Sequence, residues 1–279
     1  MISVVISVFN RTELLRKNLI RMGILTQPDE VVIVDDGTYR INEVPDMLET
    51  IDWLKGKVVY VRNENPNWDS CSIPKNIGLK TAKGDVLIYT EPENLFLTDV
   101  VKQVNDSLTE NNNLHITQKW VYFGKRNAPP FPDEALNNPQ EYLNNFGFNI
   151  WKTGTIDVHG GEDTYTKAEM VSPWILGVTK KSLIDIGGWD EDMSARNGGG
   201  AWGFDDIDLI SRLSANGCKQ FINQDLEVIH QWHERPPQNI QDSWVPNEKI
   251  KDSKKDEFGG IKKECIKANQ NREWGQIIN

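Results

Sequence analysis

Short apolar runs alternate with amphipathic stretches along residues 1–100 of the chain. The apolar runs are rich in β-branched residues and predict four buried parallel strands: Ile2 to Val8, Glu30 to Val34, Lys57 to Val61 and Asp85 to Tyr89. Helical spacing of apolar residues between them predicts helices at Thr12 to Met22, Val44 to Leu54 and Ile73 to Thr81. Repeated strand–helix units in this order predict an α/β fold with a doubly wound, mostly parallel sheet.

The rhythm changes near Asn111, where residues typical of loops become frequent. Further along we expect a strand at Trp174 to Thr179, a helix that begins at Asp205 and a strand at Leu226 to Ile229. Beyond Pro237 the chain is strongly charged and has no long apolar period. Residues 238–279 are therefore expected to form a loosely packed tail or a lid.

Composition and charge narrow the class of protein. The chain has 279 residues, of which 38% are hydrophobic and 26% charged, as in a globular protein with one large domain or two small ones. Its start has no basic leader, and no apolar run is long enough to cross a bilayer, so we expect a cytoplasmic protein without a transmembrane segment. Three scattered cysteines predict neither a disulfide framework nor a zinc site. The net charge of −10 argues against nucleic acid as the main partner.

Polar residues follow each predicted parallel strand, at the edge where such sheets bind ligands. Asn10 and Arg11 end the first strand, and Asp35-Asp36-Gly37 ends the second. A carboxylate at this second position can accept a hydrogen bond from the imide N–H of a nucleobase. The alternative is an Asp-Gly turn that binds nothing.

Glu91-Pro92-Glu93 ends the fourth strand, and its two carboxylates are suitable ligands for a hard cation such as Mg²⁺ or Mn²⁺. That cation would hold a diphosphate. The alternative is two solvated acids in a surface loop. His230 and His233 follow a late apolar strand, where we expect at least one imidazole to bind metal and the other to pack or to form a hydrogen bond.

Two helix starts carry further candidate residues. Lys75 lies near the start of the third helix, a position that favours an anion, although capping with an exposed lysine is a strong alternative. Asp205 and Asp206 begin a later helix, behind a Gly-rich lead-in that contains Trp202. One aspartate would suffice as a helix cap, so the sequence favours a functional site here.

Five segments together are similar to one known family: Ile2 to Arg11, Val32 to Thr38, Lys75 to Asp85, Gly187 to Glu191 and Trp202 to Asp208. They resemble glycosyltransferases of the family 2 type, which have the nucleotide-sugar-binding GT-A fold. The last two segments resemble the acceptor half that β-1,4-galactosyltransferases share with chondroitin-polymerase modules. The resemblance implies a single GT-A domain over residues 1–237, with a nucleotide-sugar half at 1–110, an acceptor half at 111–237 and a tail or lid at 238–279.

The resemblance also implies an activity, namely inverting transfer of a sugar from a nucleotide-diphosphate sugar to a hydroxyl acceptor. A UDP-sugar is the expected donor and a glycan the expected acceptor. Asp206 matches the catalytic base of those relatives, and Asp205 is placed to hold the acceptor hydroxyls. Asp36 is the expected contact to the base. A histidine after the late strand completes the metal shell, and we prefer His233 over His230.

The family's metal motif is Asp-x-Asp, and this chain has Glu91-Pro92-Glu93 in its place. Glu93 is expected to bind Mn²⁺ or Mg²⁺ directly, and Glu91 to contact the ribose or a metal-bound water. Asn10, Arg11, Lys75 and Trp202 are expected to contact the donor. The alternative function is a non-catalytic carbohydrate- or nucleotide-binding module whose metal site has degenerated.

Overall fold

A computed structural model of the protein describes residues 1–64, 71–124, 131–146, 149–152, 173–200, 203–234 and 245–277. Its first half alternates strands and helices as the hydrophobic pattern predicts. The elements are β1 (Ile2–Val8), α1 (Thr12–Leu25), β2 (Glu30–Asp35), α2 (Glu43–Glu49), β3 (Val58–Arg62), α3 (Ser72–Thr81) and β4 (Val86–Thr90).

The second half is more irregular. Its elements are β5 (Asn94–Phe96), α4 (Val100–Glu110), β6 (Leu114–Phe123), α5 (Pro139–Phe146), β7 (Asn149–Lys152), β8 (Ile175–Thr179), α6 (Lys180–Asp185), α7 (Asp205–Ala215), β9 (Lys219–His230) and α9 (Val245–Ser253). Strands β5, β6 and β7 and helices α4 and α5 were not expected from the sequence. The predicted strand at the end of this half begins earlier than expected, at Lys219 rather than Leu226.

The strands form one sheet in the order β3-β2-β1-β4-β8-β6-β9-β5, and β7 pairs with β6. The first four strands are parallel, β8 is antiparallel to both of its neighbours, and β6 runs parallel to β9. This topology confirms the predicted α/β fold with a doubly wound, mostly parallel sheet.

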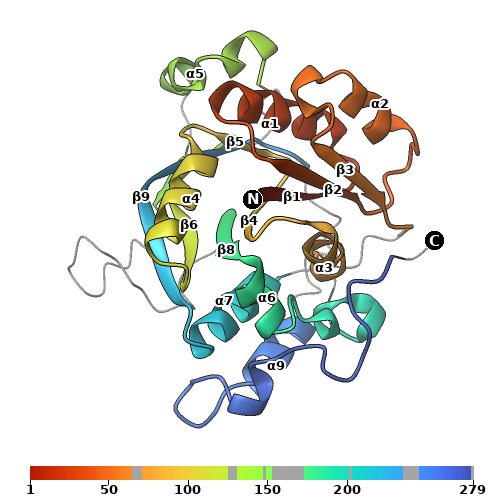
Figure 1. Ribbon diagram of the computed structural model, residues 1–279, viewed down its shortest axis with the longest axis vertical. Coiled ribbons are helices and arrows are strands. Elements are labelled where there is room, and N and C mark those ends of the chain that lie inside the picture. Colours follow the sequence, from red (N-terminus) through yellow and green to blue (C-terminus); the bar gives the residue numbers. More distant parts are fainter. Residues whose placement is uncertain are drawn as a thin grey trace.

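Helices cover both faces of the sheet (Figure 1). Alternate residues of β1 point to opposite faces: Val4 and Ile6 pack with α1, α2 and α4, whereas Val5 packs with α3, α6 and α7. Helix α3 lies close against the strands, because a Cβ at Gly78 would come within 2.3 Å of Val5 Cγ1. This close packing fixes the start of α3, and with it Lys75, at the carboxyl edge of the sheet.

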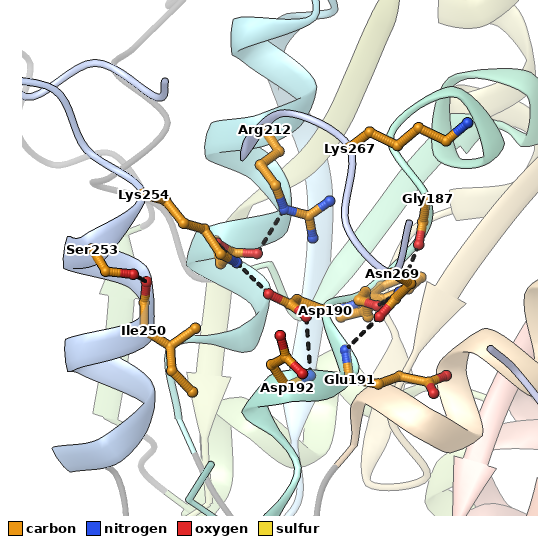
Figure 2. A network of polar contacts seen from close by, with 12 residues as sticks. Gly187, Asp190, Glu191, Asp192, Arg212, Ile250, Ser253, Lys254, Lys267 and Asn269 are labelled. Carbon is orange, nitrogen blue, oxygen red and sulfur yellow. Dashed lines mark hydrogen bonds and ion pairs between the residues drawn. The ribbon is translucent and has the colours of Figure 1, made fainter. Parts of the chain in front are cut away.

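The described part of the C-terminal region is anchored to the rest of the fold at a few buried positions, which a loosely packed tail would not be. Asn247 and Lys254 are buried, and the Ala268 N–H donates to the Ile186 carbonyl. Asn269 donates to the carbonyls of Gly187 and Trp189 and accepts from the Glu191 N–H (Figure 2). Whether residues 238–279 form a unit separate from 1–237 stays a prediction. No helix in the described ranges combines the length and the apolar character needed to cross a membrane.

Candidate active site

The carboxyl ends of β1, β2 and β4 lie side by side, because the register pairs Val8 with Asp35 and Ile6 with Thr90. The turns that follow these strands carry Asn10, Asp36 and the Glu91–Glu93 segment. Sequence-distant candidates therefore share one edge of the sheet.

Glu93 is buried and lies between β4 and β5, and the antiparallel pairing of Asn94 with His230 places it beside the end of β9. Its Oε1 lies 3.2 Å from His233 Nε2, 3.5 Å from His230 Nε2 and 2.8 Å from Arg11 Nη1. We call Glu93, His230, His233 and Arg11 the Glu93 cluster. The two histidines and the glutamate, all expected as metal ligands, are thus brought together.

The donor set of the Glu93 cluster fits a divalent cation. One ligand atom from each of Glu93, His230 and His233 lies within 4.8 Å of the others. Glu93 Oε2 is buried and has no hydrogen-bond partner among the residues that the structure describes, which is costly unless something binds there. His233 Nδ1 lies 2.8 Å from the Glu234 carbonyl, a contact that orients the ring so that Nε2 faces Glu93. A mixed imidazole and carboxylate set suits Mn²⁺ better than Mg²⁺.

The environment of the Glu93 cluster sets the protonation states of its side chains. Burial alone would raise the pKa of Glu93, but the Arg11 guanidinium and the hydrogen bond from His233 outweigh it and hold that pKa well below its usual range. Burial lowers the pKa of His230 to about 4, so its imidazole is neutral at neutral pH. An ionised carboxylate and a neutral imidazole are the forms that bind metal.

A second group of charges surrounds Lys75. Its Nζ lies 2.9 Å from Asp206 Oδ1, 3.3 Å from Glu91 Oε1 and 3.8 Å from Asp205 Oδ2. We call Lys75, Glu91, Asp205 and Asp206 the Lys75 cluster. The lysine, which was expected to hold an anion or to be exposed, is buried and directed at these carboxylates. Glu91, expected near the ribose or a metal-bound water, contacts this lysine.

Three acids around one ammonium leave excess negative charge, and the pKa values respond. Burial raises the pKa of Asp205 to about 7, with a further contribution from the adjacent Asp206 charge. Burial also raises the pKa of Glu91, although the ammonium of Lys75 opposes the rise. Within the described part of the chain, Asp205 Oδ2 is buried and has no hydrogen-bond partner, so it can accept a hydrogen bond from a hydroxyl.

The turn before α7 presents these aspartates in a constrained geometry. Gly203 has φ +87° and Phe204 has φ +64°, so two consecutive residues are left-handed. The left-handed conformation of a non-glycine residue such as Phe204 costs on the order of 1–3 kcal/mol. Asp205 and Asp206 then begin α7, whereas the third acid, Asp208, is buried away from the site against Arg212.

Trp189 is a further candidate for the site, which sequence reasoning did not single out as a contact of Asp206. Its indole Nε1–H donates to Asp206 Oδ1 at 3.2 Å, and its ring lies 5.6 Å from Lys75 Nζ. Asn76 holds the Trp189 backbone by accepting from its N–H and donating to its carbonyl. The preceding Gly187 and Gly188 are both left-handed, at φ +73° and +69°, and this glycine pair is the signal that marks a special turn.

The expected nucleotide edge combines the buried Asp36 and Asn63 with the exposed Asn10. Asp36 Oδ1 accepts from Asn63 Nδ2 at 2.6 Å. Asn10 is left-handed at φ +53°, and its Oδ1 accepts from the Tyr39 N–H at 2.9 Å. Asn10 thus fastens the end of β1 to the loop after β2. Trp202, the remaining expected donor contact, lies outside the described residues.

A family model described as Glycosyl transferase family 2 matches residues 3–166, more than half of the chain. The chain belongs to glycosyl transferase family 2. The family 2 match includes Asp36, Lys75 and both glutamates of the Glu91–Glu93 segment, whereas Asp205, Asp206 and both histidines lie beyond it.

Solved structures of other proteins share the fold of this family 2 chain. The structure of GalNAc-T7 with UDP, GalNAc and Mn²⁺ aligns with a TM-score of 0.62 and 15% identity, over 85% of this chain and 45% of that chain. S. aureus TarS 1–349 aligns with a TM-score of 0.56 and 15% identity, over 82% of this chain and 60% of that chain. The chain therefore spans about half the length of the solved proteins it matches. None of the curated proteins matches it.

Proposed function

We propose that this family 2 chain is a metal-dependent inverting glycosyltransferase that moves a sugar from a nucleotide-diphosphate sugar, a UDP-sugar in the first instance, to a hydroxyl of a glycan acceptor. The observation that carries the proposal is the juxtaposition of two clusters at one sheet edge. The Glu93 cluster offers a site for Mn²⁺ or Mg²⁺, and the Lys75 cluster offers a carboxylate for proton transfer. Mn²⁺ bound to a relative, GalNAc-T7, supports the same choice of metal.

In this proposal the protein's own residues divide the work. Glu93, His230 and His233 would hold a divalent cation, which would supply Lewis-acid stabilisation of the diphosphate leaving group. Asp206 takes the proton of the acceptor hydroxyl as its oxygen forms a bond to the anomeric carbon. Attack from the face opposite the leaving diphosphate inverts that carbon, and the diphosphate departs with the electron pair of the broken bond.

Two neighbouring side chains orient the Asp206 carboxylate for this role. Lys75 Nζ and Trp189 Nε1 both donate to its Oδ1, which leaves Oδ2 for the acceptor hydroxyl. These two donors fix the orientation of the carboxylate before the substrate arrives, and such preorganisation is a main source of catalysis. Asp205, with its pKa raised to about 7, can hold a second acceptor hydroxyl as donor or as acceptor of a hydrogen bond.

A binding module without catalysis is the second candidate, because Glu91-Pro92-Glu93 replaces Asp-x-Asp. Glu93 Oε2 is buried, lies beside two imidazoles and accepts no hydrogen bond from any described residue, which argues against a degenerate metal site. Turnover of the donor separates the two candidates.

The test is a thermal-shift panel of UDP, GDP and CMP, each with and without Mn²⁺. A ligand that binds only the folded state raises the melting temperature in proportion to RT ln(1 + [L]/Kd). We expect a shift with UDP that requires Mn²⁺, followed by UDP release from UDP-glucose or UDP-N-acetylgalactosamine. A shift without turnover would favour the binding module, and no shift with any nucleotide would contradict the proposed donor site.

A further inference from the structure

Helix α9 lies against the turn that carries the candidate catalytic aspartates, although it is distant in sequence and belongs to the charged C-terminal region. Asn247, Lys251 and Lys254 are spaced by four and three residues, so they lie on one face of the helix and its C-terminal end. Each of the three contacts the segment from Gly200 to Asp208. We call this set the α9 face.

Asn247 fastens the backbone on both sides of residues 201–202. Its Oδ1 accepts from the Gly200 N–H at 2.7 Å, and its Nδ2 donates to the Gly200 carbonyl at 3.2 Å and to the Gly203 carbonyl at 2.9 Å. The side chain is only 1% exposed. An amide is required here, because one end must accept and the other must donate.

Lys251 contacts the strained residue of the turn. Its Nζ lies 4.4 Å from the centre of the Phe204 ring, a cation–π arrangement that favours the left-handed conformation in which Phe204 is held. Because Phe204 directly precedes Asp205, its backbone angles set the direction in which the first turn of α7 leaves.

Lys254 ties the same helix to the turn that carries Trp189. Its Nζ lies 2.6 Å from Asp208 Oδ1 and 2.5 Å from Asp190 Oδ2, and Figure 2 shows it pointing from the end of α9 to Asp190. Asp208 is two residues after Asp206, and Asp190 is one residue after Trp189. One ammonium therefore joins the two elements that position the Asp206 carboxylate.

We propose that the α9 face positions the catalytic centre: Asn247 and Lys251 hold the turn at Gly203–Phe204, and Lys254 holds α7 against the Trp189 turn. None of these three residues contacts substrate in this proposal, so each is a positioning residue. The claim that α9 holds the turn stands on contacts alone. Its catalytic consequence rests on the function proposed above.

The experiment compares Asn247→Asp, Lys251→Met and the control Lys249→Met. Asn247→Asp keeps the acceptor for Gly200 but replaces the N–H donors with an oxygen. Lys251→Met removes the cation while keeping an extended side chain, and Lys251→Arg restores the cation. Lys249→Met makes the same charge change on an exposed position of the same helix.

Hydrogen–deuterium exchange of the full chain is the first readout. We expect exchange of residues 203–208 to be on the order of tenfold faster in Asn247→Asp and Lys251→Met, and unchanged in Lys249→Met and Lys251→Arg. Wild-type exchange rates in both Asn247→Asp and Lys251→Met would overturn the proposal. This readout needs no activity, so it decides the positioning of the turn even if the proposed function fails.

UDP release from UDP-glucose or UDP-N-acetylgalactosamine is the second readout. We expect kcat to fall on the order of tenfold to a hundredfold in Asn247→Asp and Lys251→Met, because these two residues hold the turn from which Asp206 is presented. Recovery of kcat in Lys251→Arg supports the cation's role. The variants could instead show faster exchange and a lower melting temperature while kcat stays at the wild-type value. Helix α9 would then only stabilise the fold, and its proposed role in positioning the catalytic centre would be overturned.

Discussion

The Glu93 cluster and the Lys75 cluster lie at the same sheet edge but balance their charge in opposite ways. In the Glu93 cluster, one carboxylate faces a guanidinium and two imidazoles, and its pKa is held well below the usual range. In the Lys75 cluster, three carboxylates share one ammonium, and the pKa of Asp205 is raised to about 7. The first arrangement suits a cation, and the second retains protons near neutral pH.

One short turn separates the two environments. Glu91 and Glu93 are two residues apart, and the turn between them is closed by a hydrogen bond from the Asn94 N–H to the Glu91 carbonyl. The side chain of Glu91 joins the Lys75 cluster and that of Glu93 joins the histidines. Identical residue types in one motif therefore acquire different chemistry from what the rest of the fold places around them.

Asp206→Asn should break the Lys75 cluster with the largest effect. The amide keeps the size of the side chain but cannot take a proton, and a general base contributes about 10²–10⁴-fold to rate. We expect kcat for UDP release to fall by that range while the Mn²⁺-dependent thermal shift with UDP persists. Asp185→Asn, the same change on the surface, serves as the control. Undiminished turnover in Asp206→Asn would rule out its role as base.

Glu93→Gln should break the Glu93 cluster, and Glu91→Gln is its matched control from the other cluster. The amide at position 93 loses the charge that binds metal, so we expect the affinity for Mn²⁺, measured by titration of the thermal shift with UDP, to fall at least about 10–100-fold, the loss that indirect metal contacts already produce. Glu91→Gln should retain the metal-dependent shift. The reverse pattern would exchange the roles that we assign to the two glutamates.

The sequence predicted the first half of the fold well because its strands are nearly pure apolar runs. Val31–Val34 in β2 are all fully buried, so the pattern and the structure carry the same information. Strand β6 was missed because His115, Thr117 and Gln118 interrupt its apolar pattern. They are buried nevertheless, since each finds a polar partner; Gln118 Oε1, for example, accepts from the Ile175 N–H.

For the candidate site, the sequence identified residue types at strand ends but not their grouping. The location of Glu93 beside His230 follows from the antiparallel pairing of β5 with β9, and β5 has only three residues and no pattern of its own. The contact from Trp189 to Asp206 depends on the left-handed glycines before it, whose φ angles no sequence pattern specifies. Long-range pairing and local backbone geometry were the missing information.

Asp205→Asn tests whether the Lys75 cluster retains a proton that the Glu93 cluster does not. Its expected effect is smaller than those above and concerns stability rather than rate. The usual pKa of an aspartate is about 3.9, and burial raises that of Asp205 to about 7 in the folded protein. In the unfolded chain Asp205 is ionised above about pH 5, whereas the folded protein still binds a proton there. Because the folded state binds more protons in this window, the free energy of unfolding falls as pH rises from about 4 to 7.

Integrated from pH 6 to 7, this single carboxyl lowers the free energy of unfolding by about 1 kcal/mol, or about 2–4 °C in melting temperature. The difference between wild type and Asp205→Asn isolates the effect, because all other titrating groups are common to both proteins. As pH rises from 6 to 7, we expect the melting temperature of the variant to increase relative to that of wild type by about 2–4 °C. Parallel curves would mean that Asp205 is already ionised, and the Lys75 cluster would then no longer differ from the Glu93 cluster in retaining a proton near neutral pH.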